Sequence, residues 1–520
     1  MKRLLTRACA KIARFFWSWG FLKFVLVSVT LIILLYAEED WRGARAWAAT
    51  KAEWEAKGES FDFNRLIPPP VPDDQNLAAL PLFKMEPDPD PKNKGHLAPL
   101  ALQRALRNDL PGNNLFIPHV GNWQEGQLPD MKKFPEIIAA DYAEAFKTAP
   151  PPNDSLAQFD ALYPFVADLR TAAATRPFCR FQIDYLSRPP AMDFIWLISE
   201  QIHVAKVVDF HAVLAFAAHK PDLALEDIKT NLKLISGLRQ QPFIVSGLVA
   251  IGMIAISENA IYDGLALHSW NDAQLADLQN ELSKVDFLSD CQRAMRGEIG
   301  VTIPAFDNLK AKRPRLADEL KSFYETPEAK LESWGYLPNF WADGWLDLWK
   351  VQAVNFNLNA VRFVDPKARL VFPKTVNQFT AEVAQRQGRW EAYAPWNLFA
   401  DAAAGSIANA VSQFARIQVR IDEARIACAL ERYRLAHKAY PDTLDALVPA
   451  CADELPHDIM NGQPYHYRLR PDGTFLLYSV GWNQTDDGGK VVFKYNNPSG
   501  LIDYTQGDWV WPTPQLNPQK

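Results

Sequence analysis

The chain has 520 residues, of which 48% are hydrophobic and 22% charged, so it is long enough for several domains with buried cores. Its net charge is -6, and its Lys and Arg residues are scattered. This distribution excludes a nucleic-acid surface, which needs a basic stripe to neutralise phosphates. The cysteines show no C-x-x-C spacing, so neither a zinc site nor a redox motif is predicted. We expect buried free thiols, and Cys428 with Cys451 is the pair to test for a disulfide.

The N-terminus has the charge pattern of a membrane anchor. Residues 1–23 contain basic side chains and no acidic one, and the apolar run from Phe24 to Ala37 ends at Glu38-Glu39-Asp40. Basic residues that flank a hydrophobic segment stay in the cytoplasm. The sequence therefore predicts a single-pass protein of the inner (cytoplasmic) membrane, with its N-terminus inside and its body extracytoplasmic or periplasmic.

The length of this apolar run leaves two interpretations open. A run this short is typical of a signal peptide, since a full span needs roughly 20 apolar residues. If Lys23 snorkels to the interface, the apolar segment extends over residues 15–37. This segment is then long enough to cross the bilayer. Cleavage after Ala37 would place Leu35 at the -3 position, where small residues are needed. We therefore favour an uncleaved anchor.

The chain after the anchor divides by composition. A juxtamembrane helix and a Pro-rich connector are predicted over 38–100, and the connector should lie along the body because it contains Leu77, Leu80, Leu82 and Phe83. A mostly helical body of α-helical hairpins is predicted over 101–400, with four helices between Ala191 and Val285. Within them, the apolar run Phe243–Ile256 reads as a buried helix rather than a second span.

Tryptophans recur in the second half of the body, at Trp334, Trp341, Trp345 and Trp349. Their four- and seven-residue steps place them near one helical face. Core packing is the simpler interpretation, and an aromatic groove for a partner or a glycan is the alternative.

In the C-terminal segment, 401–520, the spacing of apolar residues changes from one typical of a helix to one typical of strands. Apolar residues from Ile417 to Leu435 keep a three-four spacing, which predicts a long helix from about Ala415 to His437. Residues 465–469 and 474–478 then predict two paired strands across the turn Pro471-Asp472-Gly473. The fold class is therefore mainly α: a cytoplasmic basic segment and N-terminal transmembrane helix within 1–37, a body of α-helical hairpins, and a C-terminal α+β domain with one long helix on a small antiparallel sheet.

The C-terminal segment contains a series of distinctive stretches in a fixed order: Ala429-Leu430-Glu431-Arg432-Tyr433-Arg434-Leu435, Tyr440-Pro441, Leu455-Pro456-His457-Asp458, Gly462-Gln463-Pro464-Tyr465-His466-Tyr467 and Tyr478-Ser479-Val480-Gly481. In their order and spacing, over roughly 90 residues, they resemble the globular domain of the type II secretion major pseudopilin. The resemblance implies a pilin-like fold. It implies a calcium site with the Val480 carbonyl and the side chains of Asn483, Asp486 and Asp487 as ligands, all hard oxygens. Asn483 stands where the family usually has Asp, and Asp486-Asp487-Gly488-Gly489 is also an ordinary turn.

The N-terminus departs from the pseudopilin pattern. Gly20-Phe21 is present, but Val25 stands where the family has Glu, and a long body separates the anchor from the pilin-like helix. Assembly into a filament is therefore not expected. The rest of the chain, including Trp41-Arg42-Gly43 and Pro68-Pro69-Pro70-Val71-Pro72-Asp73, resembles uncharacterised single-pass membrane proteins of Planctomycetes and Verrucomicrobia.

The sequence contains no established catalytic motif. It has no G-x-S-x-G elbow, H-E-x-x-H pair, P-loop or dinucleotide fingerprint, and His203, His211 and His219 drift around their helix instead of converging on one metal. No catalytic residue and no certain cofactor are predicted. The favoured function is a non-enzymatic binding or structural envelope protein with envelope partners. The alternative is an extracytoplasmic hydrolase with a site between the helical block and the Trp-rich region.

Overall fold

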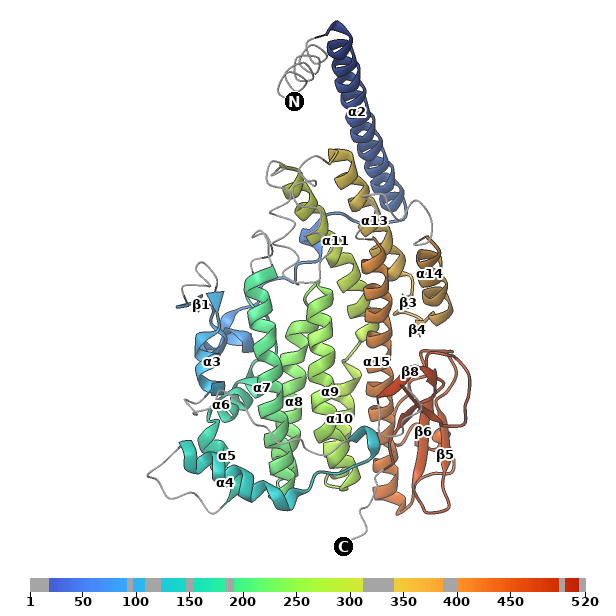
Figure 1. The fold of residues 1–520 in the computed structure, drawn as a ribbon. Helices are drawn as coiled ribbons and strands as arrows, with labels where there is room; N and C mark the ends of the chain where they lie inside the picture. The colour runs from blue at the N-terminus through green and yellow to red at the C-terminus, as the bar shows by residue number, and fades with distance from the viewer. Residues whose placement is uncertain are drawn as a thin grey trace, which may run out of the picture. The chain divides into compact units, whose positions relative to one another are not determined.

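The computed structural model describes residues 18–90, 97–107, 123–145, 154–183, 185, 191–311, 341–386, 400–494 and 501–513. These residues are mostly helical, with small antiparallel sheets towards the C-terminus, as predicted (Figure 1). Two compact units are each assembled from separated stretches of chain. The anchor unit comprises residues 1–61, 299–356 and 383–404, and the main unit comprises 62–298, 357–382 and 405–520.

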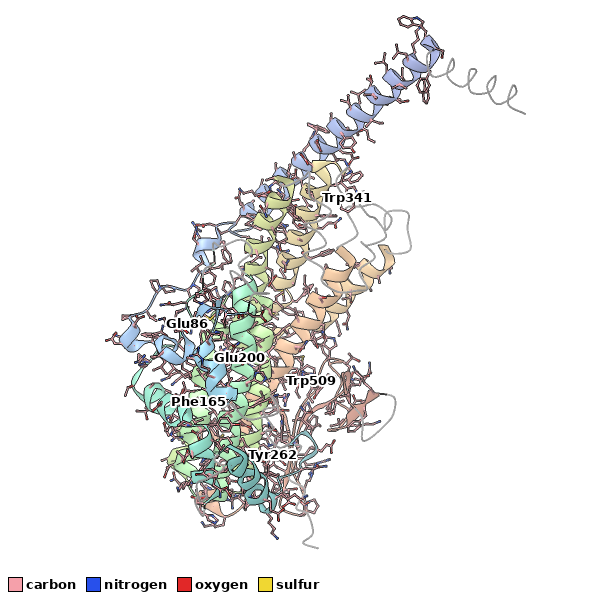
Figure 2. The ribbon with its side chains drawn as sticks, turned by 60° about the vertical axis from the view of Figure 1, so that its left-hand side comes forward. Glu86, Phe165, Glu200, Tyr262, Trp341 and Trp509 are labelled. Atoms are coloured by element: carbon pink, nitrogen blue, oxygen red, sulfur yellow. The ribbon has the colours of Figure 1, made fainter. Side chains whose placement is uncertain are left out.

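The predicted anchor is the N-terminal part of one unbroken helix, α2 (Trp19–Ala56), of 38 residues. The Ser18 hydroxyl caps it by accepting a hydrogen bond from the Phe21 N–H (3.1 Å). None of its most apolar window is buried, and side chains such as Leu31 are more than half exposed (Figure 2). The helix is about 57 Å long at 1.5 Å per residue, against a hydrocarbon core of about 30 Å. It is therefore long and apolar enough to span a membrane.

The polar half of α2 crosses α13 (Asp343–Val361) within the anchor unit, backbone against backbone. A Cβ added at Gly344 would lie 1.9 Å from the Glu39 carbonyl oxygen, and one added at Gly43 would lie 2.1 Å from the Gly344 carbonyl oxygen. The acidic residues that end the apolar run also bind α13: Asp40 accepts from the Gly344 N–H (2.9 Å) and Glu39 from the Trp345 indole (2.8 Å). The juxtamembrane half of α2 is thus an integral part of the unit.

Core packing accounts for two of the predicted tryptophans. Trp341 and Trp349 are 6% and 2% exposed, and their rings pack edge to face at 5.3 Å. Trp345 is half-buried, and Trp334 lies outside the described residues. The simpler interpretation of this region is confirmed for Trp341 and Trp349.

The four predicted helices of the main unit are α7 (Ala191–Ala217), α8 (Pro221–Arg239), α9 (Ile244–Ala266) and α10 (Asp272–Ser283). Pro221 opens α8, and Asn271 with Gln274 forms a capping box at α10, as their sequence signals indicate. Helices α7, α8 and α9 pack on one another (Figure 1). Although α9 is apolar enough to span a membrane, 56% of its most apolar window is buried, so it is a core helix as predicted.

The other elements complete the described chain. The remaining helices are α3 (Leu100–Arg107), α4 (Phe134–Ala145), α5 (Ser155–Leu162), α6 (Phe165–Thr175), α11 (Phe287–Ala311), α14 (Pro373–Arg386) and α15 (Ala400–His437). Two short hairpins pair β1 (Glu86–Pro87) with β2 (Leu97–Ala98) and β3 (Val364–Asp365) with β4 (Leu370–Val371).

The C-terminal helix α15 begins at Ala400 rather than near Ala415, because the buried positions Ile407, Val411 and Phe414 continue the same helical spacing upstream. The predicted hairpin is confirmed: β5 (His466–Leu469) pairs with β6 (Phe475–Ser479), and β9 (Trp509–Trp511) adds a third antiparallel strand. A second sheet of β7 (Val491–Phe493) and β8 (Ile502–Gly507) was not predicted. A pilin-like fold stays a prediction.

Free thiols fit the expectation from the sequence. Cys179, Cys291, Cys428 and Cys451 are buried and free, so the Cys428–Cys451 pair is not bonded.

Candidate functional site

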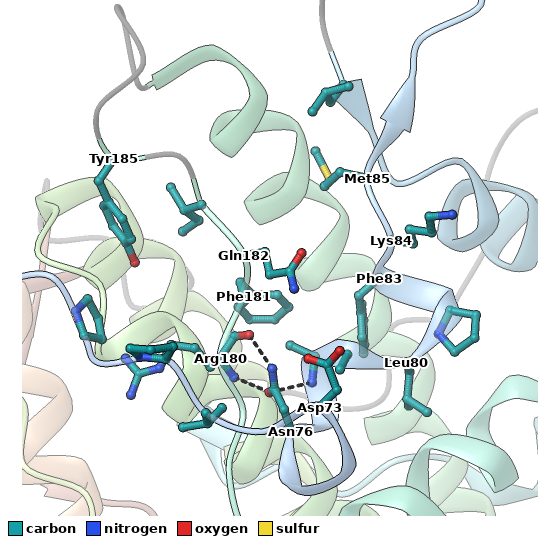
Figure 3. Close-up of a pocket in the computed structure, with 18 of the residues that line it drawn as sticks. Asp73, Asn76, Leu80, Phe83, Lys84, Met85, Arg180, Phe181, Gln182 and Tyr185 are labelled. Carbon is teal, nitrogen blue, oxygen red and sulfur yellow. Dashed lines mark hydrogen bonds between the residues drawn. The ribbon is translucent and has the colours of Figure 1, made fainter.

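A groove of about 1040 Å³ lies in the main unit, between the Pro-rich connector and the extended segment after α6 (Figure 3). We call it the strap groove. One wall comes from the strap, residues 67–85, and the other from residues 180–183 and 185. Leu97 closes one side.

The strap lies along the body, as its apolar residues predict. Prolines prevent regular helix and strand, so the chain advances in short 3-10 turns, η3 (Leu77–Ala79) and η4 (Pro81–Phe83). Leu77 is fully buried, Phe83 is 4% exposed, and the Phe83 ring packs edge to face on Phe181 at 5.7 Å. These contacts form the apolar floor of the groove.

Asn76 holds the two walls together. Its amide nitrogen donates to the Arg180 carbonyl (2.9 Å), and its amide oxygen accepts from the N–H groups of Arg180 (2.7 Å) and Ala78 (3.1 Å), as Figure 3 shows. The side chain is 3% exposed. Asn76 therefore supplies partners to backbone groups that would otherwise be buried without hydrogen bonds.

The Arg180 guanidinium is the unusual group in this groove. Its Nε and Nη1 atoms are buried without a hydrogen-bond partner among the described residues. Burial lowers the pKa of Arg180, with smaller opposing contributions from the Tyr185 phenol and the Cys179 thiol. A charged group that lacks its hydrogen bonds is costly. An anion that accepts hydrogen bonds from Nε and Nη1 would remove this cost.

Tyr185 lines one part of the groove, and other aromatic rings pack behind it. The Tyr185 ring stacks on Phe243 at 5.9 Å and meets Phe63 at 6.4 Å, and its hydroxyl donates to the Gln241 side chain. The other walls are Pro, Val, Ile, Leu and Met side chains. A ligand of this groove would therefore contact apolar atoms over most of its length.

The lining of the strap groove has few ionisable side chains. Asp73, Lys84, Arg180 and Tyr185 are the ionisable residues in the described wall, and Lys84 is on the rim with a side chain 72% exposed. A histidine or cysteine is absent from this lining. The groove can bind an anion with a long apolar tail.

The predicted calcium ligands do not all meet at one point. The Asn483 amide nitrogen contacts an Asp487 carboxylate oxygen at 3.0 Å, so these two side chains meet. Asp486 instead accepts from the Tyr478 hydroxyl (2.9 Å) and lies 3.5 Å from His466. A hydrogen bond from the Gly488 N–H, followed by that from Tyr478, lowers the pKa of Asp486.

Val480 is buried, and its N–H donates to Asp458 (2.9 Å). Among the described residues, no group of three or more His, Cys, Asp or Glu side chains is placed to hold a metal ion. Two of the three predicted side-chain ligands meet, and calcium binding stays a prediction.

A carboxylate outside the predicted set organises this loop. Asp508 is 2% exposed and accepts from the N–H groups of Asp487 (3.1 Å), Gly489 (2.7 Å) and Lys490 (3.3 Å). The loop thus has an internal anion at its centre, bound by successive backbone donors.

The three spaced histidines have separate partners. His203 contacts Glu200 at 3.3 Å, whereas His211 lies between Asp160 and Asp227. His219 ends its helix with a positive φ of 57°. These positions agree with the expectation that they do not converge on one metal.

Sequence reasoning missed Arg180 and Asp508 as organising residues. Arg180 stands between Cys179 and Phe181 in an otherwise apolar stretch, and an isolated charge of this kind is a usable signal. Asp508 follows Gly507 directly and has no comparable signal. The alternative hydrolase site also stays a prediction.

Comparisons with family models, with curated proteins and with solved structures found no match to this chain.

Proposed function

We propose that the chain is a membrane-anchored, non-enzymatic binding protein, held in the inner membrane with its body outside the cytoplasm, whose strap groove takes up an anion with a long apolar chain. The observation that carries this proposal is the Arg180 guanidinium in the wall of an apolar groove, whose Nε and Nη1 atoms find no hydrogen-bond partner in the part of the chain that the structure describes.

Two features of α2 support an uncleaved anchor. The helix continues without a break through Leu35, Tyr36 and Ala37, where cleavage would have to occur. Trp19 and Trp41 are 77% and 61% exposed and lie about 33 Å apart along the axis, a separation that suits aromatic belts at the two membrane interfaces. The basic N-terminal residues place that end in the cytoplasm.

The orientation predicts a protease result. Protease added to cells whose outer layer has been permeabilised should digest the body and leave an N-terminal epitope tag protected. Lysis of the inner membrane should remove that protection. A body that resists protease until lysis would contradict the orientation, and a tag missing from mature protein would contradict the uncleaved anchor.

The apolar wall favours a hydrocarbon chain over a peptide. An extended peptide needs donors and acceptors along its backbone, and the Asn76 amide already bonds Arg180 and Ala78. A hydrocarbon chain needs only apolar surface, and its single anionic head would complete the hydrogen bonding of Arg180. The ligand class is thus a fatty-acid-like carboxylate.

Matched probes test the groove directly. Dodecanoate and dodecanol share a chain length and differ in the head group, and each can be measured by equilibrium dialysis with the full chain in nanodiscs against empty nanodiscs. We expect dodecanoate to bind at least about 10-fold more tightly, since a charge-assisted hydrogen bond contributes about 1.5–3 kcal/mol. The Arg180→Met variant should abolish this discrimination while keeping the apolar wall.

Lys84→Met is the matched control, because Lys84 also lines the groove but lies on its exposed rim. Its dodecanoate affinity should stay within about 3-fold of wild type. Equal affinities for the two probes, or an equal loss in both variants, would contradict Arg180 as the head-group site.

The C-terminal segment enters this proposal as a displayed pilin-like module that contacts envelope proteins. Calcium at the loop of Asn483 and Asp487 would rigidify that module. Nucleic acid is not proposed as a partner.

A further inference from the structure

A second cavity, of about 240 Å³, lies in the main unit between α9, α15, the β5–β6 turn and the end of β9. We call it the Tyr262 pocket, after the α9 residue in its wall that Figure 2 labels. Its volume is below the 300–1,000 Å³ typical of sites for drug-sized ligands. It therefore selects a small ligand, and it shares no lining residue with the strap groove.

Aromatic rings make the apolar part of this pocket. The rings of Tyr262 and Trp511 are 6.0 Å apart, and those of Tyr440 and Phe475 are 5.0 Å apart. Such walls accept an aromatic or aliphatic group.

The side of the pocket formed by α15 contains the Glu431 carboxylate, whose oxygens already accept hydrogen bonds from neighbouring side chains. Glu431 accepts from His268 Nδ1 (2.9 Å), from Arg434 Nε (2.8 Å) and Nη2 (2.6 Å), and from the Tyr440 hydroxyl (3.1 Å). Burial alone would raise the pKa of Glu431, but the hydrogen bonds from Arg434 and His268 lower it below the usual value. Glu431 is therefore ionised and has little capacity for a ligand.

Donors remain unused on this same side of the pocket. Tyr262 is only 1% exposed, and its hydroxyl has no hydrogen-bond partner among the described residues. A buried hydroxyl of this kind is costly unless a ligand supplies the partner. Arg434 uses Nε and Nη2 on Glu431, which leaves Nη1 available. The Tyr262 hydroxyl and Arg434 Nη1 are donors that match the two oxygens of a carboxylate.

The β5–β6 turn contributes a negative charge to the pocket, the carboxylate of Asp472. Asp472 Oδ1 accepts from both the N–H (2.9 Å) and the hydroxyl (2.7 Å) of Thr474, and these bonds lower the pKa of Asp472. Its second oxygen, Oδ2, is available on the solvent side. A cation beside it would be favoured.

We propose that the Tyr262 pocket binds a small zwitterion, an α-amino acid with an apolar side chain. Its carboxylate meets Tyr262 and Arg434, its ammonium meets Asp472, and its side chain lies between the aromatic walls. This assignment places each unused donor and acceptor opposite a group of the ligand that needs it.

Three probes separate the charges of the ligand: L-phenylalanine, phenylacetate and phenethylamine. Titration calorimetry on the full chain in nanodiscs should show L-phenylalanine binding at least about 10-fold more tightly than either single-charge probe. Asp472→Asn should weaken L-phenylalanine about 10-fold and leave phenylacetate unchanged. Tyr262→Phe, which keeps the ring, should weaken both by a similar factor.

Asp503→Asn is the control, because Asp503 accepts the same two hydrogen bonds from Thr505 (3.1 and 2.7 Å) but lies in β8, outside the lining of this pocket. It should leave all three affinities unchanged. The proposal is overturned if L-phenylalanine gives no binding, if phenylacetate binds equally well, or if Asp503→Asn matches Asp472→Asn.

Discussion

Replacing His211 with glutamine should cost about 3 kcal/mol of folding stability at pH 6 and much less at pH 10. His211 is fully buried on α7, between two carboxylates. Its Nδ1 lies 2.5 Å from Asp227, its Nε2 lies 3.0 Å from Asp160, and Arg170 contacts Asp227 at 2.7 Å. The cluster joins α5, α6, α7 and α8 through charge rather than apolar packing.

The pH dependence follows from the pKa of this imidazole. Burial by itself lowers the pKa of His211, but hydrogen bonds to Asp160 and Asp227 outweigh burial and raise it to about 9, against 6.5 in the unfolded chain. The stabilisation is therefore complete below pH 6.5 and is lost as the pH rises through about 9. Each unit of difference in pKa corresponds to about 1.4 kcal/mol.

Denaturant unfolding of wild type and His211→Gln from pH 6 to pH 10 measures this effect. The two free energies of unfolding should converge as the pH rises. His203→Gln is the control, because His203 lies on the same helix with a side chain 46% exposed, and it should change stability by less than about 1 kcal/mol. Parallel curves for wild type and His211→Gln would show that the histidine is neutral in the folded protein.

Asn76→Leu should destabilise the strap by about 3 kcal/mol and destroy the groove with it. The substitution has a similar volume but removes three hydrogen bonds, two to the Arg180 backbone and one to the Ala78 N–H. Those groups would remain buried without partners. The strap should then open more often, since the contacts that still hold it to the body are its apolar side chains, two backbone hydrogen bonds with Phe178 (2.7 and 3.1 Å) and the Arg176 side chain on the carbonyls of Asp73 and Asn76.

Limited proteolysis measures this opening. Cleavage between residues 62 and 90 should accelerate on the order of 100-fold in Asn76→Leu, and dodecanoate binding should disappear. Gln75→Leu is the control, since Gln75 is the exposed neighbouring amide, and its cleavage rate should match wild type. Slow cleavage with intact binding in Asn76→Leu would show that the apolar contacts, the backbone hydrogen bonds with Phe178 and the Arg176 side chain hold the strap without the Asn76 amide.

Features that depend on local spacing were predictable from the sequence. The apolar N-terminal helix, the helices opened by Pro221 and Asn271, and the β5–β6 hairpin follow from periodicity, caps and turn residues within a few positions. The strap was also predictable, because proline removes the regular alternatives while Leu77 and Phe83 demand burial.

The candidate site was not predictable in the same way. Its walls are separated by about a hundred residues, and the hydrogen bonds between Asn76 and Arg180 appear only when both segments meet. The same limit applies to the C-terminal loop, where Asp508 binds backbone groups of residues 487–490. The resemblance to the pseudopilin domain implied that Asp486 and Asp487 share a calcium ion, whereas the Asp486 side chain accepts a hydrogen bond from the Tyr478 hydroxyl (2.9 Å).

The most direct test of the central claim is photo-crosslinking of the membrane-embedded full chain with a diazirine-labelled dodecanoate, followed by peptide mapping. We predict labelled peptides from residues 67–85 and 180–185, competition by unlabelled dodecanoate but not by dodecanol, and loss of these labels in Arg180→Met. Labels confined to α2, or strap labels that persist unchanged in Arg180→Met, would contradict a groove that binds a fatty-acid-like carboxylate through Arg180.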